Sequence, residues 1–312
     1  MTATVSVIIP CRNMEAHIGA AIESALTQTQ PVSEIIVIDD RSSDASRAIA
    51  EGFGGIVRVI DGFGAGSAIA RNLGIVNARG DVIAFLDADD AWAPGKNALQ
   101  LQRLEADSDV GFVCANWTQS DTPAGSTSTS FDSYSRVSDG EVFGALLHEN
   151  FVLTSTVMVR KRLLAKTGLF HPALIGGQDH ELWLRLARVT RFVTLREPLA
   201  VKGVHGGNIT ASGKYASYQA RKWQQILWEH RDVSASDQKL MRSRYRVSLH
   251  DAGRAAFLRG ALPEARAFFK RELGESPLSP GALVWLAACS LPRPALERLT
   301  ALKRSLSGSG ST

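Results

Sequence analysis

Short apolar runs alternate with helical patterns along the first 90 residues of this 312-residue chain, and Gly and Asp stand at the boundaries between them. The apolar runs predict strands at residues 5–10, 34–38, 56–60 and 82–86, and the helical patterns predict helices at residues 15–26, 43–50 and 67–76. Alternation of strands and helices is typical of a parallel sheet with helices on both faces. The first expectation is therefore an α/β fold.

Polar residues follow three of these predicted strands. The three segments are Pro10-Cys11-Arg12-Asn13, Asp39-Asp40-Arg41-Ser42 and Asp87-Ala88-Asp89-Asp90. In open α/β sheets, ligands bind beyond the carboxyl ends of the strands. We therefore expect the three segments to converge on one edge of the sheet and to form a binding site there.

The last of these segments is strongly acidic. Residues 80–90 read GDVIAFLDADD, so that an apolar run is followed by Asp87, Asp89 and Asp90. Two like charges repel by about 4 kcal/mol at roughly 4 Å in a medium of effective dielectric near 20. A divalent cation that prefers oxygen ligands, Mg²⁺ or Mn²⁺, would relieve this repulsion and could carry a substrate diphosphate. The alternative is an acidic turn that precedes a helix.

The segment GGQDHELWLRLA, residues 176–187, predicts a helix that begins near Gln178. Asp179 then shares one helical face with Leu182, Trp183 and Leu186. A carboxylate on an apolar stripe either caps the helix or faces a cavity. An ionised and poorly solvated Asp is a suitable general base.

Two further residues are candidates for binding anions or metals. Arg71 lies in a helical pattern that follows a glycine-rich segment, and its planar fork could pair with a phosphate. The alternative for Arg71 is an exposed helical arginine. His205 is flanked by glycines after a strand-like stretch and could ligate a metal or contact a diphosphate, although a lone His is more often structural.

Charge is distributed unevenly along the chain. Residues 1–150 carry a net charge of −11 and residues 151–312 a net charge of +15. The basic half predicts either an anionic partner surface, such as phospholipid or a lipid diphosphate, or a solvated helical surface. No recognisable nucleic-acid-binding module accompanies the basic residues, so nucleic acid is not expected as a partner.

The remaining composition favours a cytoplasmic protein, or one on the inner face of the membrane. The three cysteines, Cys11, Cys114 and Cys289, are far apart, which favours buried thiols over a disulfide framework. No apolar stretch reaches the length of about eighteen residues that a membrane span needs. The N-terminus has no basic segment before its apolar run and is interpreted as a first strand, not a signal peptide.

Four motifs occur in order along the chain: VSVIIPCRN, EIIVIDDRSSDAS, ARNLGIVNARGDVIAFLDADDAW and GGQDHELWLRLA. Together, over roughly residues 5–210, they resemble glycosyltransferase family two, the inverting nucleotide-sugar transferases of GT-A fold. The resemblance implies a GT-A-type mixed sheet flanked by helices and a reaction that depends on Mn²⁺ or Mg²⁺. It also implies a nucleotide-diphosphate sugar as donor, with a UDP-sugar favoured. The implied acceptor is a hydroxyl of a glycan or lipid-linked molecule in cell-surface polysaccharide or glycolipid assembly.

The resemblance also implies a role for particular residues. Asp179 matches the catalytic base, Asp89 matches the metal ligand of the DxD motif, and His205 matches a His near the diphosphate that would join the metal. One of Asp39 and Asp40 would contact the nucleotide base and ribose. The residues implied in nucleotide-sugar binding are Pro10, Arg12, Asp39, Asp40, Arg71, Asp87, Ala88 and Asp89.

At four positions the chain departs from the family pattern. Arg12 stands where relatives often have Tyr or Phe, and Gln178 replaces the Glu that commonly precedes the base. His171 occupies a position that is often Asp, and Gly203 one that is often Arg. These departures bear on the fine geometry of the acceptor and the diphosphate.

Two other functions are alternatives. The segment IVRVIDGFGAG could begin the fingerprint of a nicotinamide-dependent oxidoreductase, but Ser67 replaces the third glycine and the segment follows the third strand, not the first. The other alternative is a non-catalytic adaptor that keeps a transferase-like fold and binds through its basic tail.

Three regions are predicted along the chain. They are a transferase domain at residues 1–212, a helical C-terminal region at residues 213–306 and a disordered tail at residues 307–312. The helical region contains one tetratricopeptide-like helix pair, at residues 252–259 and 263–273. Its apolar and basic helices predict either peripheral membrane contact or packing against the catalytic domain.

Overall fold

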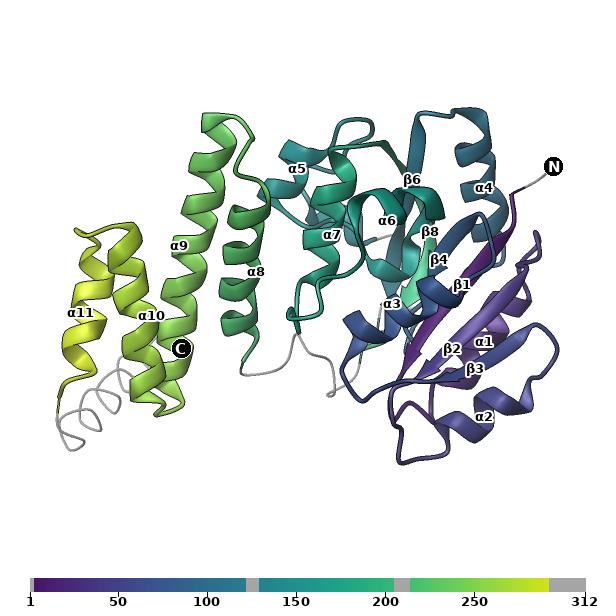
Figure 1. Ribbon diagram of the computed structural model, residues 1–312, viewed down its shortest axis with the longest axis horizontal. Helices are drawn as coiled ribbons and strands as arrows, with labels where there is room; N and C mark the ends of the chain where they lie inside the picture. Colours follow the sequence, from purple (N-terminus) through teal and green to yellow (C-terminus); the bar gives the residue numbers. More distant parts are fainter. Residues whose placement is uncertain (1–2, 122–128, 205–213, 292–312) are drawn as a thin grey trace, which may run out of the picture. The chain divides into compact units, whose positions relative to one another are not determined.

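The computed structural model describes residues 3–121, 129–204 and 214–291. The chain divides into two compact units, residues 1–208 and residues 209–312, which we call the first and the second unit. The first unit is mixed α/β and the second is helical throughout its described residues (Figure 1). The expected α/β fold with a helical C-terminal region is therefore confirmed.

An eight-stranded sheet runs through the described part of the first unit, in the order β3-β2-β1-β4-β7-β6-β8-β5. The strands are β1 (Val5–Cys11), β2 (Glu34–Asp39), β3 (Val57–Asp61), β4 (Val82–Phe85), β5 (Ala91–Trp92), β6 (Val110–Gln119), β7 (Met158–Arg160) and β8 (Arg191–Lys202). The four strands predicted from the sequence pair in parallel. The other half of the sheet, β7-β6-β8-β5, has mixed strand directions. Strand β7 is antiparallel to both β4 and β6, whereas β8 is parallel to β6 and antiparallel to β5.

Helices flank this sheet (Figure 1). They are α1 (Ile18–Leu26), α2 (Ser46–Gly52), α3 (Ser67–Asn77), α4 (Lys96–Ala106), α5 (Phe143–His148), α6 (Lys161–Thr167) and α7 (Gln178–Ala187), with short 3-10 turns at Ser130–Ser133 and Thr154–Thr156. Between β6 and α5, the chain forms the 3-10 turn at Ser130–Ser133, while residues 122–128 lie outside the described part of the chain.

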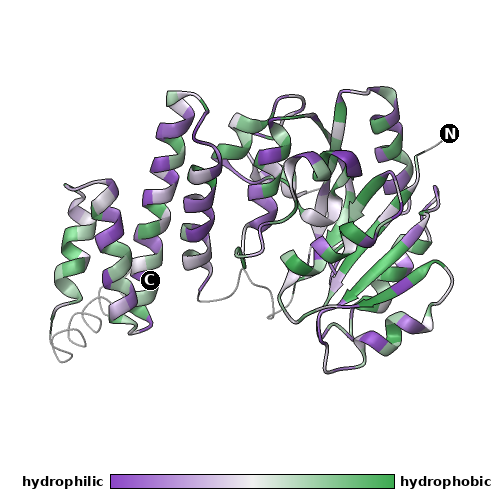
Figure 2. Ribbon diagram, in the orientation of Figure 1, coloured by the Kyte–Doolittle hydropathy of each residue, from purple (hydrophilic) through white to green (hydrophobic). Residues whose placement is uncertain are grey.

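The core of the first unit lies on both faces of the sheet. All six residues of β2 are buried, and the central strands are almost wholly apolar (Figure 2). Strands covered on both faces carry continuous apolar runs instead of alternating apolar and polar residues. These runs are the pattern from which the strands were predicted. Gly74 lets α3 approach β1 closely, since a Cβ at this position would lie 2.5 Å from the Ile8 side chain.

The second unit is a series of helices in which each packs against the next. They are α8 (Tyr215–Glu229), α9 (Ala235–Leu258), α10 (Leu262–Glu275) and α11 (Pro280–Ala288). The predicted tetratricopeptide-like pair falls on the end of α9 and on α10. Residues 292–306 and the predicted tail at 307–312 lie outside the described residues. None of the helices in the described ranges has both the length and the apolar character to cross a membrane.

All three cysteine side chains are buried and free of disulfide bonds, as the sequence predicts. Burial raises the pKa of the Cys11 thiol to about 11 and that of the Cys114 thiol to about 12. Burial also raises the pKa of Cys289. Cys11 and Cys114 belong to the first unit and Cys289 to the second.

Candidate functional site

The three polar segments predicted to converge do follow neighbouring strands. In the order β2-β1-β4, the strands lie side by side and parallel, so their carboxyl ends share one edge. Cys11 is paired with Asp39, and the Leu86 amide donates to the carbonyl of Ile8. We call this edge, with the loops that follow it, the strand-end site.

Asp40 organises the glycine-rich loop that leads into α3. Its carboxylate accepts hydrogen bonds from the backbone amides of Gly64 at 2.7 Å, Ala65 at 3.2 Å and Gly66 at 2.8 Å. Asp39 is engaged more weakly, with the Ser42 amide at 3.3 Å and an Arg47 nitrogen at 3.9 Å. Of the two aspartates, Asp39 is thus the one with more capacity left for a ligand.

Arg71 reaches the acidic segment from the middle of α3. It is 4% exposed, so the alternative of an exposed helical arginine is wrong. One of its terminal nitrogens, Nη2, pairs with Asp87 at 2.5 Å, while its Nε and Nη1 are buried and have no hydrogen-bond partner within the described residues. The guanidinium also lies over the Phe170 ring, 5.4 Å from its centroid. Two buried donor atoms of this cation therefore have no hydrogen-bond partner among the described residues.

Asp90 is buried and has a structural role. The Ser155 hydroxyl and the Gly203 amide, the latter at 2.9 Å, both donate to its carboxylate. Burial, with added repulsion from Asp87 and Asp89, raises the pKa of Asp90 to about 7. The repulsion expected within the acidic segment is thus eased by the ion pair of Asp87 with Arg71 and by the raised pKa of Asp90, which lets this carboxyl hold a proton near neutral pH.

Gly203 explains one departure from the family pattern. A Cβ at this position would overlap the backbone oxygen of Asp89. Any side chain at residue 203 would therefore push the acidic turn out of place. The glycine permits β8 to end directly against that turn, and no sequence pattern indicated this contact.

Asp89 fits a divalent cation only in combination with a substrate. The described residues contain no group of three His, Cys, Asp or Glu side chains that could hold a metal by itself. Mg²⁺ commonly binds to one or two carboxylates and takes its other oxygen ligands from substrate phosphates and water. Asp89 is half-buried on the acidic turn, which suits such a shared site. His205, predicted as a further ligand, lies outside the described residues.

Asp179 lies in the first turn of α7, as predicted, and Leu182, Trp183 and Leu186 on the same helix are buried. Gly177 precedes the helix in a left-handed conformation (φ 77°) that favours glycine. Asp179 is half-buried, and its Oδ2 lies 3.4 Å from the Asn150 amide nitrogen. Asp179 thus lies at the N-terminal end of α7, where the helix dipole is positive.

Gln178 joins α7 to α3. Its side-chain nitrogen donates to the Ser67 hydroxyl at 3.0 Å, whereas its Oε1 is buried without a hydrogen-bond partner in the described structure. Ser67 lies one helical turn before Arg71. The residue that replaces the usual Glu thus connects the helix of the predicted base with the helix of the predicted phosphate ligand.

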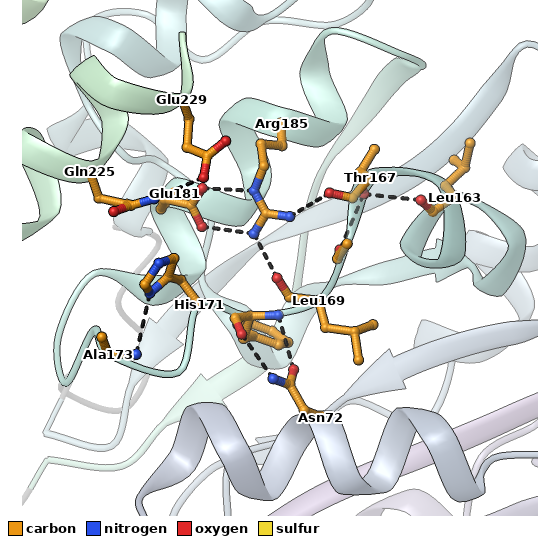
Figure 3. Close-up of polar contacts among 12 residues, drawn as sticks. Asn72, Leu163, Thr167, Leu169, His171, Ala173, Glu181, Arg185, Gln225 and Glu229 are labelled. Carbon is orange, nitrogen blue, oxygen red and sulfur yellow. Dashed lines mark hydrogen bonds and ion pairs between the residues drawn. The ribbon is translucent and has the colours of Figure 1, made fainter.

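A second connection runs through Arg185 (Figure 3). Its guanidinium forms a bidentate pair with Glu181, at 2.7 and 2.8 Å, and donates to the carbonyl oxygens of Thr167 at 2.7 Å and Leu169 at 2.6 Å. The Glu181 side chain is fully buried, and that of Arg185 is 15% exposed. This pair therefore fixes α7 to the end of α6 and to the segment that follows it.

Asn72 holds the same segment from α3 (Figure 3). Its side chain donates to the Phe170 carbonyl at 2.8 Å and accepts from the Phe170 amide at 2.9 Å. Together, Asn72, Glu181 and Arg185 lock the segment between two helices that carry predicted site residues. Sequence reasoning missed Ser155, Asn150 and these contacts of Asn72, Glu181 and Arg185. The only sequence signal for them was the four-residue spacing of Glu181 and Arg185, which is typical of an ion pair on one helix.

Comparisons with known proteins identify the family. The model of "Glycosyl transferase family 2" matches residues 6–168. The Escherichia coli protein "UDP-Glc:alpha-D-GlcNAc-diphosphoundecaprenol beta-1,3-glucosyltransferase WfaP" is 31% identical over 216 residues, which cover 67% of this chain and 80% of that relative. Across the curated relatives considered, the chain spans between 34% and 80% of their length.

Two solved structures share the fold. Staphylococcus aureus TarS 1–349 in complex with UDP-GlcNAc has a TM-score of 0.65 at 15% identity, over 92% of this chain and 90% of that one. The mannosyltransferase PcManGT from Pyrobaculum calidifontis, in complex with GDP-Man and Mn²⁺, has a TM-score of 0.59 at 21% identity, over 93% and 86%. The mixed sheet and its flanking helices are thus of the GT-A type, and the oxidoreductase alternative falls away. The chain belongs to glycosyl transferase family 2 and is a glycosyltransferase.

Proposed function

We propose that this glycosyltransferase moves a sugar from a nucleotide-diphosphate donor, a UDP-sugar first of all, to a hydroxyl of a glycan or lipid-linked acceptor. The observation that carries the proposal is Arg71, a buried cation that pairs with Asp87 and keeps two donor atoms free at the strand-end site. Buried, unpaired donors of an arginine suit a diphosphate. Assembly of a cell-surface polysaccharide or glycolipid is the proposed setting.

The proposed chemistry is a single displacement at the anomeric carbon, which inverts its configuration. Asp179 takes the proton of the acceptor hydroxyl as that oxygen attacks. Arg71 binds the diphosphate, and Asp39 with Pro10 and Arg12 lies where the nucleoside would bind. A divalent cation at Asp89 would supply positive charge to the departing diphosphate. A product of retained configuration would contradict this mechanism.

The relatives support the choice of donor and acceptor classes. The name of WfaP states a UDP-glucose donor and an acceptor linked to diphosphoundecaprenol. TarS is solved with UDP-GlcNAc, and the mannosyltransferase with GDP-Man and Mn²⁺. These names favour a metal-assisted reaction with a nucleotide sugar and leave uridine and guanosine nucleotides both to be tested.

Thermal unfolding with nucleotides tests the proposal. We expect UDP with Mn²⁺ to raise the Tm of the wild type, because a ligand at about a hundred times its Kd adds about 2.7 kcal/mol of stability. The thymidine and guanosine diphosphates are measured alongside. Asp89→Ala should abolish the part of the shift that depends on Mn²⁺. Asp109→Ala, at an exposed carboxylate, serves as the matched control.

Two outcomes of this experiment would change the conclusion. If none of the three diphosphates stabilises the wild type in the presence of Mn²⁺, the donor site as proposed is wrong. If a nucleotide binds but no donor sugar is ever transferred or hydrolysed, the non-catalytic adaptor becomes the better account of the chain.

We also propose that the second unit contacts an anionic membrane surface. Its described residues 214–291 contain 13 Lys and Arg against 7 Asp and Glu. Basic surfaces bind anionic lipid through charge, and salt screens this attraction. The protein should therefore co-sediment with vesicles that contain phosphatidylglycerol at low salt and lose this binding at high salt. Equal sedimentation with neutral vesicles, or none with either kind, would contradict the proposal.

A further inference from the structure

Arg41 adopts a backbone conformation that ordinary residues avoid. Its φ is +63°, and the only other non-glycine residue with a positive φ among the described residues is Asn13, at +53°. Asn tolerates the left-handed region because its side chain bonds locally, and the Asn13 oxygen does accept from the Ser43 amide at 2.8 Å. Arg41 has no such compensation. Strained residues of this kind cluster at functional sites.

The side chain of Arg41 lies across the glycine-rich loop. A Cβ built on Gly64 would be 3.0 Å from Cδ and 3.7 Å from Nε of Arg41. That loop is fixed by the three hydrogen bonds to Asp40. The arginine stem therefore rests on a rigid support, although the residue is exposed. Within the described chain, its guanidinium has no hydrogen bond or ion pair.

The position of Arg41 along the site indicates what it meets. It follows β2, whereas Arg71 pairs with Asp87 at the end of β4, and β1 lies between these two strands. Neighbouring strands are about 4.8 Å apart, so the two strand ends are separated by roughly 10 Å. This separation is comparable to that between the base and the terminal phosphate of an extended nucleoside diphosphate. A diphosphate at Arg71 thus places the base near β2.

From this arrangement we infer that Arg41 contacts the nucleobase of the donor and helps to select it. The inference rests on the proposed nucleotide-sugar function. A planar guanidinium either stacks on a base or donates through its fork to the carbonyl oxygens on the base edge. A lysine ammonium cannot stack and lacks the planar fork. The chain also has Arg12, not an aromatic residue, at the neighbouring end of β1. The guanidinium of Arg41 would offer the base a planar surface on this side of the site.

Calorimetric titration of wild type, Arg41→Gly and Arg41→Lys tests the inference, with Mn²⁺ present throughout. UDP is the ligand, and pyrophosphate is the control that lacks a base. We expect Arg41→Gly to weaken UDP binding about tenfold and to leave pyrophosphate binding unchanged. Arg41→Lys, which keeps the charge, should weaken UDP binding to a similar degree. The Tm of Arg41→Gly should not fall, because glycine relieves the left-handed backbone.

Each other outcome contradicts a defined part of the argument. Unchanged UDP affinity in Arg41→Gly, with normal binding by the wild type, overturns the inference alone. Equal losses for UDP and pyrophosphate, or full affinity in Arg41→Lys, would mean that Arg41 acts as a charge on the phosphates and not on the base. If the wild type binds none of the uridine, thymidine and guanosine diphosphates, the proposed function fails and the inference fails with it.

Discussion

Replacement of Asp179 by Asn is expected to lower kcat by about 10³-fold and to leave the affinity for the donor nucleotide nearly unchanged. A positioned general base contributes roughly 10²- to 10⁴-fold to a rate. Asn has almost the same shape as Asp but cannot accept the proton of the acceptor hydroxyl. The half-buried position on the first turn of α7 should tolerate it. The measurement is kcat for sugar transfer beside the Kd of the nucleotide.

Asp109→Asn makes the same chemical change at an exposed loop residue, so its kcat should equal that of the wild type. Activity of Asp179→Asn within a factor of three of the wild type would disprove its role as the base. A loss of nucleotide affinity equal to the loss of kcat would instead place Asp179 in donor binding.

The largest effect on stability is expected from Arg185→Met. This change leaves the fully buried Glu181 carboxylate without its partner and removes the donors to the Thr167 and Leu169 carbonyl oxygens. Removing one member of a buried ion pair typically destabilises a protein by about 3–5 kcal/mol. Since roughly 2–4 °C of Tm correspond to each kcal/mol in a domain of this size, a fall of about 10 °C should be seen in thermal unfolding.

Two further variants separate the causes of that fall. Arg162→Met, at an exposed arginine of α6, should shift the Tm by less than about 2 °C. The double variant Glu181→Leu with Arg185→Met should recover part of the loss, because no unpaired charge then remains buried. If the double variant is less stable than Arg185→Met alone, the pair contributes in a way other than mutual neutralisation.

The sequence predicted the parallel half of the sheet because its strands are covered on both faces and therefore stand out as apolar runs. The other half was not predicted strand by strand. β5 has two residues and β7 has three, which is too short for any periodicity to be recognised. The predicted helix at residues 15–26 begins only at Ile18, since Asn13 and Glu15 bond to the loop before α2 instead.

For the candidate site, the sequence located the residues but did not separate their roles. Asp39 and Asp40 are equivalent in a pattern, and only the path of the glycine-rich loop shows that Asp40 binds its amides. The sequence of the acidic turn likewise does not indicate that Asp90 is buried and accepts a hydrogen bond from Ser155. Contacts between residues far apart in the chain, such as Asp89 with Gly203, produce no periodic pattern in the sequence from which they could be predicted.

The three buried cysteines allow local opening of the structure to be measured through their reaction with thiol reagents. Their raised pKa values keep the thiols protonated at neutral pH, and thiol reagents react with the exposed thiolate. Alkylation therefore proceeds only as fast as the surrounding structure opens. Because Cys11 and Cys114 belong to one unit and Cys289 to the other, the opening of each unit can be timed separately in the unmodified protein.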